Sequence, residues 1–259
     1  MQTTLIERFA AKIRSLSDAE LAGAPSLHSK LRLAQGGDVE VCYCPAEYVN
    51  LHARLVLVGI TPGKTQWLNA LREARKQLRL GSDHTHVLQA AKQTGAFSGA
   101  MRNGLIDLLD HIGINRWLGI ANCSDLFGRS CHLVQTTSVL RNAVFLAGTN
   151  YNGRPNMLRH PLLREELLAH FVEDARTLSN AVFVPLGPRV TKALAFLADE
   201  GLIERKNVLV GLPHPSGANA ERIAYFLGRK NRAQLSIKTA PDKLDLAREK
   251  LLRQVAALR

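Results

Sequence analysis

A short apolar run that ends in a glycine turn constrains the fold of this chain more than any other feature. Residues 55–58 read LVLV, and a fully apolar run of this length is typical of a strand buried on both faces of a parallel sheet. Two similar runs, 181–186 (AVFVPL) and 207–212 (NVLVGL), flank a helical pattern over residues 188–200. Strands that alternate with helices in this way predict an α/β fold, a three-layer α/β/α sandwich with a central, mainly parallel sheet.

The rest of the chain supplies further elements for such a sandwich. Hydrophobic spacing predicts the helices, and short apolar or alternating runs predict the strands. The stretch 141–160 is rich in Gly, Asn and Arg and predicts a long functional loop. The other expected helices cover residues 64–80, 84–93 (capped by Asp83) and 98–112, and the other expected strands cover 39–44, 118–122 and 133–140.

The charge balance favours a polyanionic partner. The chain holds 34 Lys and Arg against 22 Asp and Glu, a formal net charge of +12. Because Lys and Arg displace counterions from phosphates, this surplus favours nucleic acid, and a generally basic surface without such a partner is the alternative. No stretch approaches the roughly 18 consecutive apolar residues of a membrane helix, and charges interrupt the apolar residues at the N-terminus. We therefore expect a cytoplasmic protein with no membrane partner.

The cysteines do not have the spacing of a metal site. Cys42 and Cys44 form a Cys-x-Cys pair, and Cys123 and Cys131 are separated by seven residues, which matches no common zinc pattern. We expect buried free thiols, and neither a metal nor a cofactor.

The turn after the first apolar run, GITPGKT, resembles a phosphate-binding loop only at its end. A Walker loop needs four residues between its first glycine and Gly-Lys-[Ser/Thr], whereas three separate Gly59 from Gly63. Pro62 also removes one of the N–H groups that would face a phosphate. A Walker-type nucleotide hydrolase is therefore disfavoured; it would show Mg²⁺-dependent nucleotide binding that Lys64→Ala abolishes.

Four stretches, in order, resemble motifs of the uracil-DNA glycosylase superfamily. GITPG (59–63) resembles the first motif, and GAFSGAMRNGLIDLLDHIGI (95–114) resembles the segment that carries a base-stacking phenylalanine. AVFVPLGPRVTKAL (181–194) is similar to the penultimate strand and the entry to the following helix. The last stretch, VLVGLPHPSGAN (208–219), contains the second signature, His-Pro-Ser-x.

The resemblance implies a uracil-DNA glycosylase-like fold in a single domain, residues 1–259. Its core would cover residues 55–228, with an N-terminal helical extension over 1–38 and a C-terminal helix over 240–259. The implied activity is that of a DNA repair glycosylase, which hydrolyses the N-glycosidic bond of uracil or another deaminated base flipped out of DNA. The implied partner is single- or double-stranded DNA with a damaged base, bound by a monomer.

The resemblance also assigns roles to individual residues. His214 would donate a hydrogen bond to the uracil oxygen as negative charge develops there, and Thr61 occupies the position that orients the attacking water. Phe97 would stack on the flipped base. The other substrate-binding residues implied are Gly59, Ile60, Pro62, Gly63, Ser138 and Asn142, and the DNA-binding residues are Lys64, Pro215, Ser216, Gly217, Asn219 and Arg222.

The first motif departs from the superfamily at its most important position. Most active branches place Asp or Asn at the position of Thr61, or Glu one residue earlier, where this chain has Ile60. A threonine hydroxyl can hold a water but is a poor general base. Asp83, His84 and His86 could bring a base from a neighbouring segment, and helix capping with surface histidines is the alternative. The alternative function is a catalytically weak or inactive nucleic-acid-binding relative.

The base-reading position departs as well. Ser138 stands where the superfamily usually has asparagine, and one hydroxyl cannot replace the paired donor and acceptor of an amide. Asn142, Asn150 or Asn152 could supply the amide instead, although asparagines are also common in turns.

Overall fold

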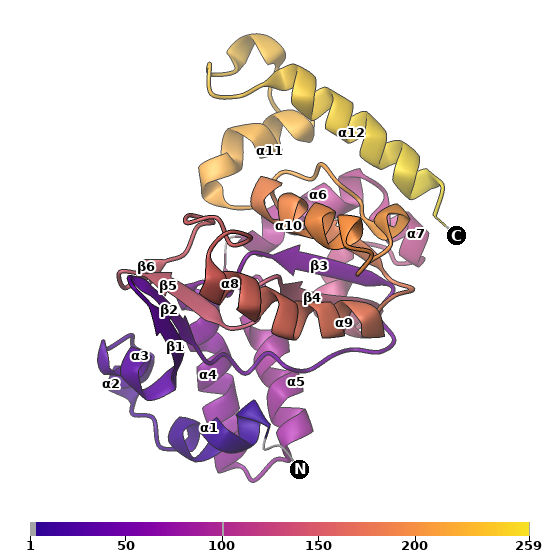
Figure 1. Ribbon diagram of the computed structural model, residues 1–259. Coiled ribbons are helices and arrows are strands. Elements are labelled where there is room, and N and C mark those ends of the chain that lie inside the picture. The colour runs from indigo at the N-terminus through magenta and orange to yellow at the C-terminus, as the bar shows by residue number, and fades with distance from the viewer. Residues whose placement is uncertain (1–3, 100, 259) are drawn as a thin grey trace. The chain divides into compact units, whose positions relative to one another are not determined.

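The computed structural model describes residues 4–99 and 101–258, which form two compact units. Unit 1 consists of Met1–Val49, Ile60–Ser98 and Thr137–Asp174, and unit 2 of Asn50–Gly59, Gly99–Thr136 and Ala175–Arg259. The chain is mixed α/β, with an antiparallel sheet and a three-stranded parallel sheet (Figure 1). The single domain expected from the sequence stays a prediction. Residues 1–3, 100 and 259, which the expected helices include, lie outside the described residues.

Unit 1 contains the antiparallel sheet. Its strand order is β1-β2-β5-β6, and β2 pairs with β5 so that Val39 lies opposite Leu146. Between β5 and β6, Ala147 and Gly148 have φ values of 45° and 75°, which is the backbone of a tight hairpin turn. This hairpin corrects the first half of the long loop expected over residues 141–160, whereas residues 151–160 contain no helix or strand, as expected. The strands are β1 (Arg32–Gly36), β2 (Val39–Cys42), β5 (Ala143–Leu146) and β6 (Thr149–Asn150).

The longest helices of unit 1, α4 (Lys64–Arg79) and α5 (His84–Gly95), run side by side (Figure 1). A Cβ on Gly95 would lie 3.0 Å from the Gln66 carbonyl oxygen, so glycine permits this close packing. Asp83 Oδ1 accepts a hydrogen bond from the His86 N–H at 3.0 Å, which confirms the predicted cap. The other helices include α1 (Leu5–Arg14), α2 (Asp18–Leu21), α3 (Ser26–Leu31) and α8 (Pro161–Glu166).

Aromatic side chains form the centre of the unit 1 core. Phe9 stacks on Tyr43 with ring centroids 4.6 Å apart, and Trp67 lies 5.1 Å from Phe145. The Trp67 indole N–H donates to the Tyr43 carbonyl oxygen at 2.8 Å, so its polar atom is satisfied within the core. Burial of each large apolar side chain contributes about 1.5–3 kcal/mol. The core therefore connects α1 and α4 with β2 and β5, the two central strands of the antiparallel sheet.

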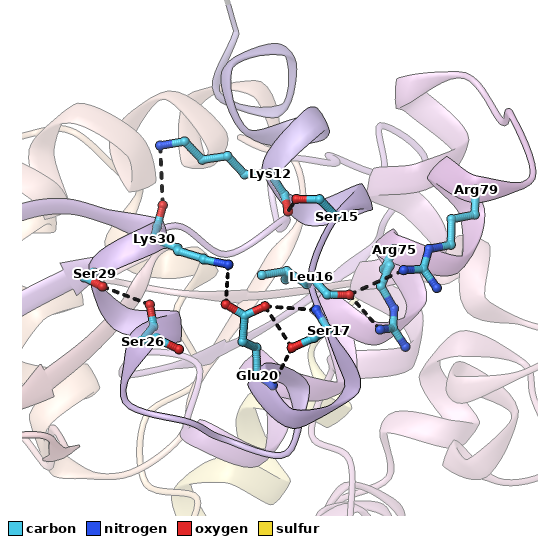
Figure 2. Close-up of polar contacts among 10 residues, drawn as sticks. All are labelled: Lys12, Ser15, Leu16, Ser17, Glu20, Ser26, Ser29, Lys30, Arg75 and Arg79. Carbon is cyan, nitrogen blue, oxygen red and sulfur yellow. Dashed lines mark hydrogen bonds and ion pairs between the residues drawn. The ribbon is translucent and has the colours of Figure 1, made fainter.

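Polar contacts fasten the N-terminal segment to α4 (Figure 2). The guanidinium groups of Arg75 and Arg79 donate to the Leu16 carbonyl oxygen at 2.9 and 3.4 Å. Glu20 pairs with Lys30 and accepts the Ser17 N–H at 2.9 Å. These hydrogen bonds, that of Lys30 first, lower the pKa of Glu20 to about 2. The N-terminal helices are thus an integral part of unit 1.

Unit 2 is built on the parallel sheet, in the order β4-β3-β7. β3 (Leu55–Gly59) is fully buried and pairs in parallel with β7 (Val182–Pro185), as the apolar runs predicted. β4 (Val134–Ser138) lies on the other side of β3. The strand expected over residues 207–212 is reduced to an isolated bridge between Val208 and Phe183.

Helices account for most of the remainder of unit 2. The strand expected over residues 118–122 is wrong, because α7 (Ile114–Leu118) ends there at Gly119, which adopts a left-handed φ of 69°. No helix among residues 4–99 and 101–258 is long and apolar enough to cross a membrane. The other helices include α6 (Met101–His111), α10 (Pro188–Asp199), α11 (Ala220–Phe226) and α12 (Pro241–Ala256).

Candidate functional site

Side-chain hydrogen bonds close the turn that leads into α4. Gln66 Oε1 accepts the Gly63 N–H at 2.7 Å, and Asn150 Oδ1 accepts the Lys64 N–H at 2.8 Å. Pro62 has no N–H to offer. A phosphate cradle needs these donors free. The Walker-type alternative is therefore contradicted by the hydrogen bonds as well as by the loop length.

Thr61 is held by the backbone of the antiparallel sheet. Its hydroxyl donates to the Asn142 carbonyl oxygen at 2.8 Å and accepts the Val144 N–H at 3.0 Å. The single hydroxyl hydrogen is thus in use, and one lone pair remains for an attacking water. In this geometry Thr61 can accept a hydrogen bond from a water but cannot donate one.

Asn142 has no exposed surface, and its amide is already engaged. Its Oδ1 accepts the Cys44 N–H at 3.1 Å, and its Nδ2 donates to Glu166 Oε1 at 2.8 Å. Reading a base would require breaking these contacts, which tie three segments of unit 1 together. Ser138, at the end of β4, is partly buried, and Asn152 is exposed.

Phe97 has an unusual backbone conformation. It follows α5 with a φ of 47°, a left-handed value that costs a residue with a Cβ about 1–2 kcal/mol. Its neighbour Ser98 is anchored to α4, since Asn69 Nδ2 donates to Ser98 Oγ at 3.1 Å. The ring is only partly buried. Strained residues of this kind cluster at functional sites.

A buried group of charges in unit 1 was not predicted from the sequence. Lys92 is nearly inaccessible to solvent, and its Nζ donates to the Ala46 carbonyl oxygen at 2.9 Å and to that of Tyr48. Burial lowers the pKa of Lys92 to about 8. Burial also raises the pKa of Glu47, whose Oε1 accepts the Tyr43 hydroxyl at 2.8 Å.

Arg141 completes this buried group at a widened turn of a helix. Residues Leu167–Phe171 form a π-helical turn, a feature often found at functional sites. Arg141 Nη2 donates to the His170 carbonyl oxygen at 3.0 Å within this turn and to Asp174 Oδ1 at 2.6 Å. The guanidinium group therefore binds a backbone carbonyl and one oxygen of a buried carboxylate, while the other carboxylate oxygen, Asp174 Oδ2, is buried without a hydrogen-bond partner among the described residues.

In unit 2, the second signature places His214 in one defined protonation state. Its Nδ1 lies 3.2 Å from the Ser216 nitrogen and accepts that N–H. Burial lowers the pKa of His214, so the ring is neutral at neutral pH. With Nδ1 as an acceptor, the ring proton lies on Nε2. His214 is thus a neutral donor through Nε2–H.

The other residues of the second signature stabilise their own loop. Asn219 Nδ2 donates to Ser216 Oγ at 3.1 Å, and Arg222 Nη1 donates to Asn219 Oδ1 at 2.6 Å. Arg222 Nη2 donates to the Lys238 carbonyl oxygen at 3.0 Å, so this guanidinium group already has two partners. Pro215 is buried, whereas Gly217 is exposed at the start of the next turn.

The described residues contain no group of three or more His, Cys, Asp or Glu side chains that could hold a metal ion. Cys42, Cys44, Cys123 and Cys131 form no disulfide among the described residues. The first three are buried, as expected, whereas Cys131 is only partly buried. Burial raises the pKa of Cys42 to about 12. For residues 83–86, the sequence allows either a helix cap or a catalytic base. The structure shows the helix cap, which is formed by Asp83.

The fold and these residues define a mixed α/β protein with one antiparallel and one parallel sheet. The chain belongs to the same family as the uncharacterized protein YoxB of Bacillus subtilis (strain 168). The two are 32% identical over 248 residues, which cover 95% of this chain and 96% of its relative. No family model matches the chain, and no solved structure matches it.

Proposed function

We propose that this protein is a DNA glycosylase of the uracil-DNA glycosylase type, with the three-layer α/β/α sandwich of that superfamily. It would hydrolyse the N-glycosidic bond of uracil or another deaminated base. The four ordered motif resemblances, the buried parallel strand that precedes GITPG and the net charge of +12 support the proposal. A flipped base is read by hydrogen bonds and by stacking, and the chain offers residues for both.

The tautomer of His214 carries the proposal. Bond cleavage leaves negative charge on the departing base, and a neutral N–H donor fixed beforehand stabilises that charge without reorganising. The Ser216 N–H occupies Nδ1 and directs Nε2–H outward from this pair. A surface histidine without a role has no need of such a fixed tautomer.

Phe97 supports the proposal from unit 1. A partly exposed aromatic ring leaves a face for stacking on a base, and its strained backbone is of the kind found at functional sites. Stacking of a base on an aromatic side chain contributes about 1–3 kcal/mol.

The alternative function, nucleic-acid binding without efficient base release, is favoured by Thr61. Its hydroxyl hydrogen is committed to the Asn142 carbonyl oxygen, and neither Ile60 nor Thr61 supplies a carboxylate or an amide. Activation of a water would then depend on electrostatic stabilisation of the transition state alone.

The two functions are separated by an assay for base release. Single- and double-stranded oligonucleotides that carry uracil, hypoxanthine or xanthine are incubated with the protein and tested for alkali-labile sites. We expect cleavage of at least one substrate, and a loss of about 10²-fold or more in His214→Ala. Phe97→Ala should weaken binding of the substrate, while Phe97→Leu should retain part of it.

His52→Ala is the matched control, because His52 is an exposed histidine in a turn of unit 2 to which no role is assigned. Absence of cleavage on every substrate, with affinity for the oligonucleotides retained, would support the binding-only alternative. Equal rates in the His214→Ala variant and the wild type would exclude His214 from the chemistry.

A further inference from the structure

A tight turn in unit 2, Ser236–Thr239, presents an apolar side chain to solvent. The Thr239 N–H donates to the Ser236 carbonyl oxygen at 3.0 Å, which closes the turn. Ile237, at its tip, is fully exposed, and Lys238 beside it is also exposed. A β-branched apolar residue in such a position gains nothing from folding.

The turn is held rigidly despite its exposure. The Glu221 carboxylate accepts four hydrogen bonds: from the Ser236 N–H at 3.1 Å, from the Ser236 hydroxyl at 2.6 Å, from the Thr239 hydroxyl at 2.5 Å and from Lys230 Nζ at 2.8 Å. These contacts, that of Lys230 first, hold the pKa of Glu221 well below its usual range. Both ends of the turn are therefore fixed to one carboxylate at the start of α11.

The same clamp connects the turn to the second signature. Arg222 donates to the Lys238 carbonyl oxygen at 3.0 Å and to Asn219 Oδ1 at 2.6 Å, and Asn219 in turn donates to Ser216. A continuous chain of hydrogen bonds therefore links the loop of His214 to the turn that carries Ile237.

The charge around the turn selects the kind of partner. Residues 222–239 contain no Asp or Glu. Arg229, Lys230 and Arg232 have acidic partners, namely Asp107, Glu221 and Asp242, whereas the side chain of Lys238 has none among the described residues. An unneutralised cation beside an apolar tip matches the alternation of phosphates and apolar sugar and base surfaces along a nucleic acid.

We propose that the Ser236–Thr239 turn is a nucleic-acid contact, in which Lys238 pairs with a phosphate and Ile237 packs against sugar and base surfaces. This inference deepens the proposed function and rests on it for the identity of the partner. In this contact Glu221 and Arg222 are positioning residues, because their hydrogen bonds hold the turn in place.

The test measures binding separately from base release. Fluorescence anisotropy with labelled single-stranded and duplex oligonucleotides gives affinity as a function of salt, and 2-aminopurine in the strand reports unstacking. Ile237→Ala should weaken binding about tenfold and reduce the 2-aminopurine signal. Lys238→Ala should lower the slope of log affinity against log salt by about 1.

Matched controls come from α12 of the same unit. Leu246 is a similarly exposed apolar residue and Lys250 an exposed lysine, so Leu246→Ala and Lys250→Ala should bind as the wild type does. Glu221→Gln replaces an acceptor oxygen with an amide that faces hydroxyl donors. It should weaken binding as Ile237→Ala does, with little further loss in the double variant.

The outcomes distinguish this inference from the proposed function. Binding that depends on Ile237 and Lys238, without base release, would support the contact and exclude the glycosylase. Base release with binding unchanged in Ile237→Ala and Lys238→Ala would overturn the contact and leave the glycosylase in place. No binding to either form of oligonucleotide would overturn both.

Discussion

Gly187 and His214 approach each other so closely that a Cβ on Gly187 would lie 3.1 Å from the Cβ of His214. Gly187 precedes α10 and has a φ of 88°, so glycine is required for the backbone and for the contact alike. The Leu-Gly-Pro sequence at this point thus sets the space available to the histidine.

This contact predicts an effect of Gly187→Ala beyond backbone strain. The strain alone should lower the free energy of unfolding by about 1–2 kcal/mol, and displacement of His214 should add to it. Gly201→Ala is the matched control, since Gly201 has a φ of 68° and open space around its Cβ position. Urea denaturation measures both, and equal losses would show that the histidine contact has no energetic consequence.

The tautomer of His214 can be observed directly. We expect ¹⁵N NMR of the imidazole to show a proton on Nε2, an unprotonated Nδ1 and a pKa below 6.5, because burial disfavours the charged ring. Because the pKa of His214 is lower in the folded chain than in the unfolded chain, the unfolded chain binds the proton first when the pH falls below 6.5. Protonation of His214 should therefore lower the free energy of unfolding in this range. A proton on Nδ1 at neutral pH would contradict the assignment.

Asn150 should stabilise the start of α4. Loss of the Lys64 N–H contact in Asn150→Ala should lower the free energy of unfolding by about 1 kcal/mol, as loss of a helix cap does. Asn152→Ala, two residues along in an exposed position, should change it by less than about 0.5 kcal/mol. Comparable losses in chemical denaturation would show that the cap contributes nothing.

The lowered pKa of Lys92 predicts that the free energy of unfolding depends on pH in alkaline solution. Its pKa falls from 10.5 for an unperturbed lysine to about 8 in the fold. Between these values the unfolded chain binds the proton and the folded chain does not, so the contribution of Lys92 to stability rises with pH. The free energy of unfolding of the wild type, minus that of Lys92→Met, should therefore increase from about pH 8 to 10.5. A difference that stays constant over this range would mean that Lys92 titrates normally.

The sequence predicted the elements whose signal is local. The apolar run at 55–58 and the periodic segment that became α4 gave the right type and nearly the right bounds. The sequence does not predict the β5–β6 hairpin, because its turn, Ala147-Gly148, is a weak turn signal in a stretch full of glycine and asparagine. The segment 118–122 has the composition of a strand, but Gly119 ends a helix there.

The candidate site residues also differ in whether their contacts could be predicted from the sequence. Neighbours in sequence, such as His214 and Ser216, could be recognised as a motif. The commitment of Asn142 to Cys44 could not, because it joins residues 98 positions apart. The buried charges at Lys92 and Arg141 stand in segments with no common pattern, so that only the folded chain brings them together.

The widened turn at Leu167–Phe171 has a consequence for how this chain can vary. Each residue of a helix rotates the next by about 100°, so deletion of one residue there would turn Asp174 away from Arg141. The number of residues in the segment is therefore fixed, and so are the apolar side chains of Leu167 and Phe171, which are buried in the core. In related chains this stretch should exclude insertions and deletions and accept substitutions only at its exposed or partly exposed positions.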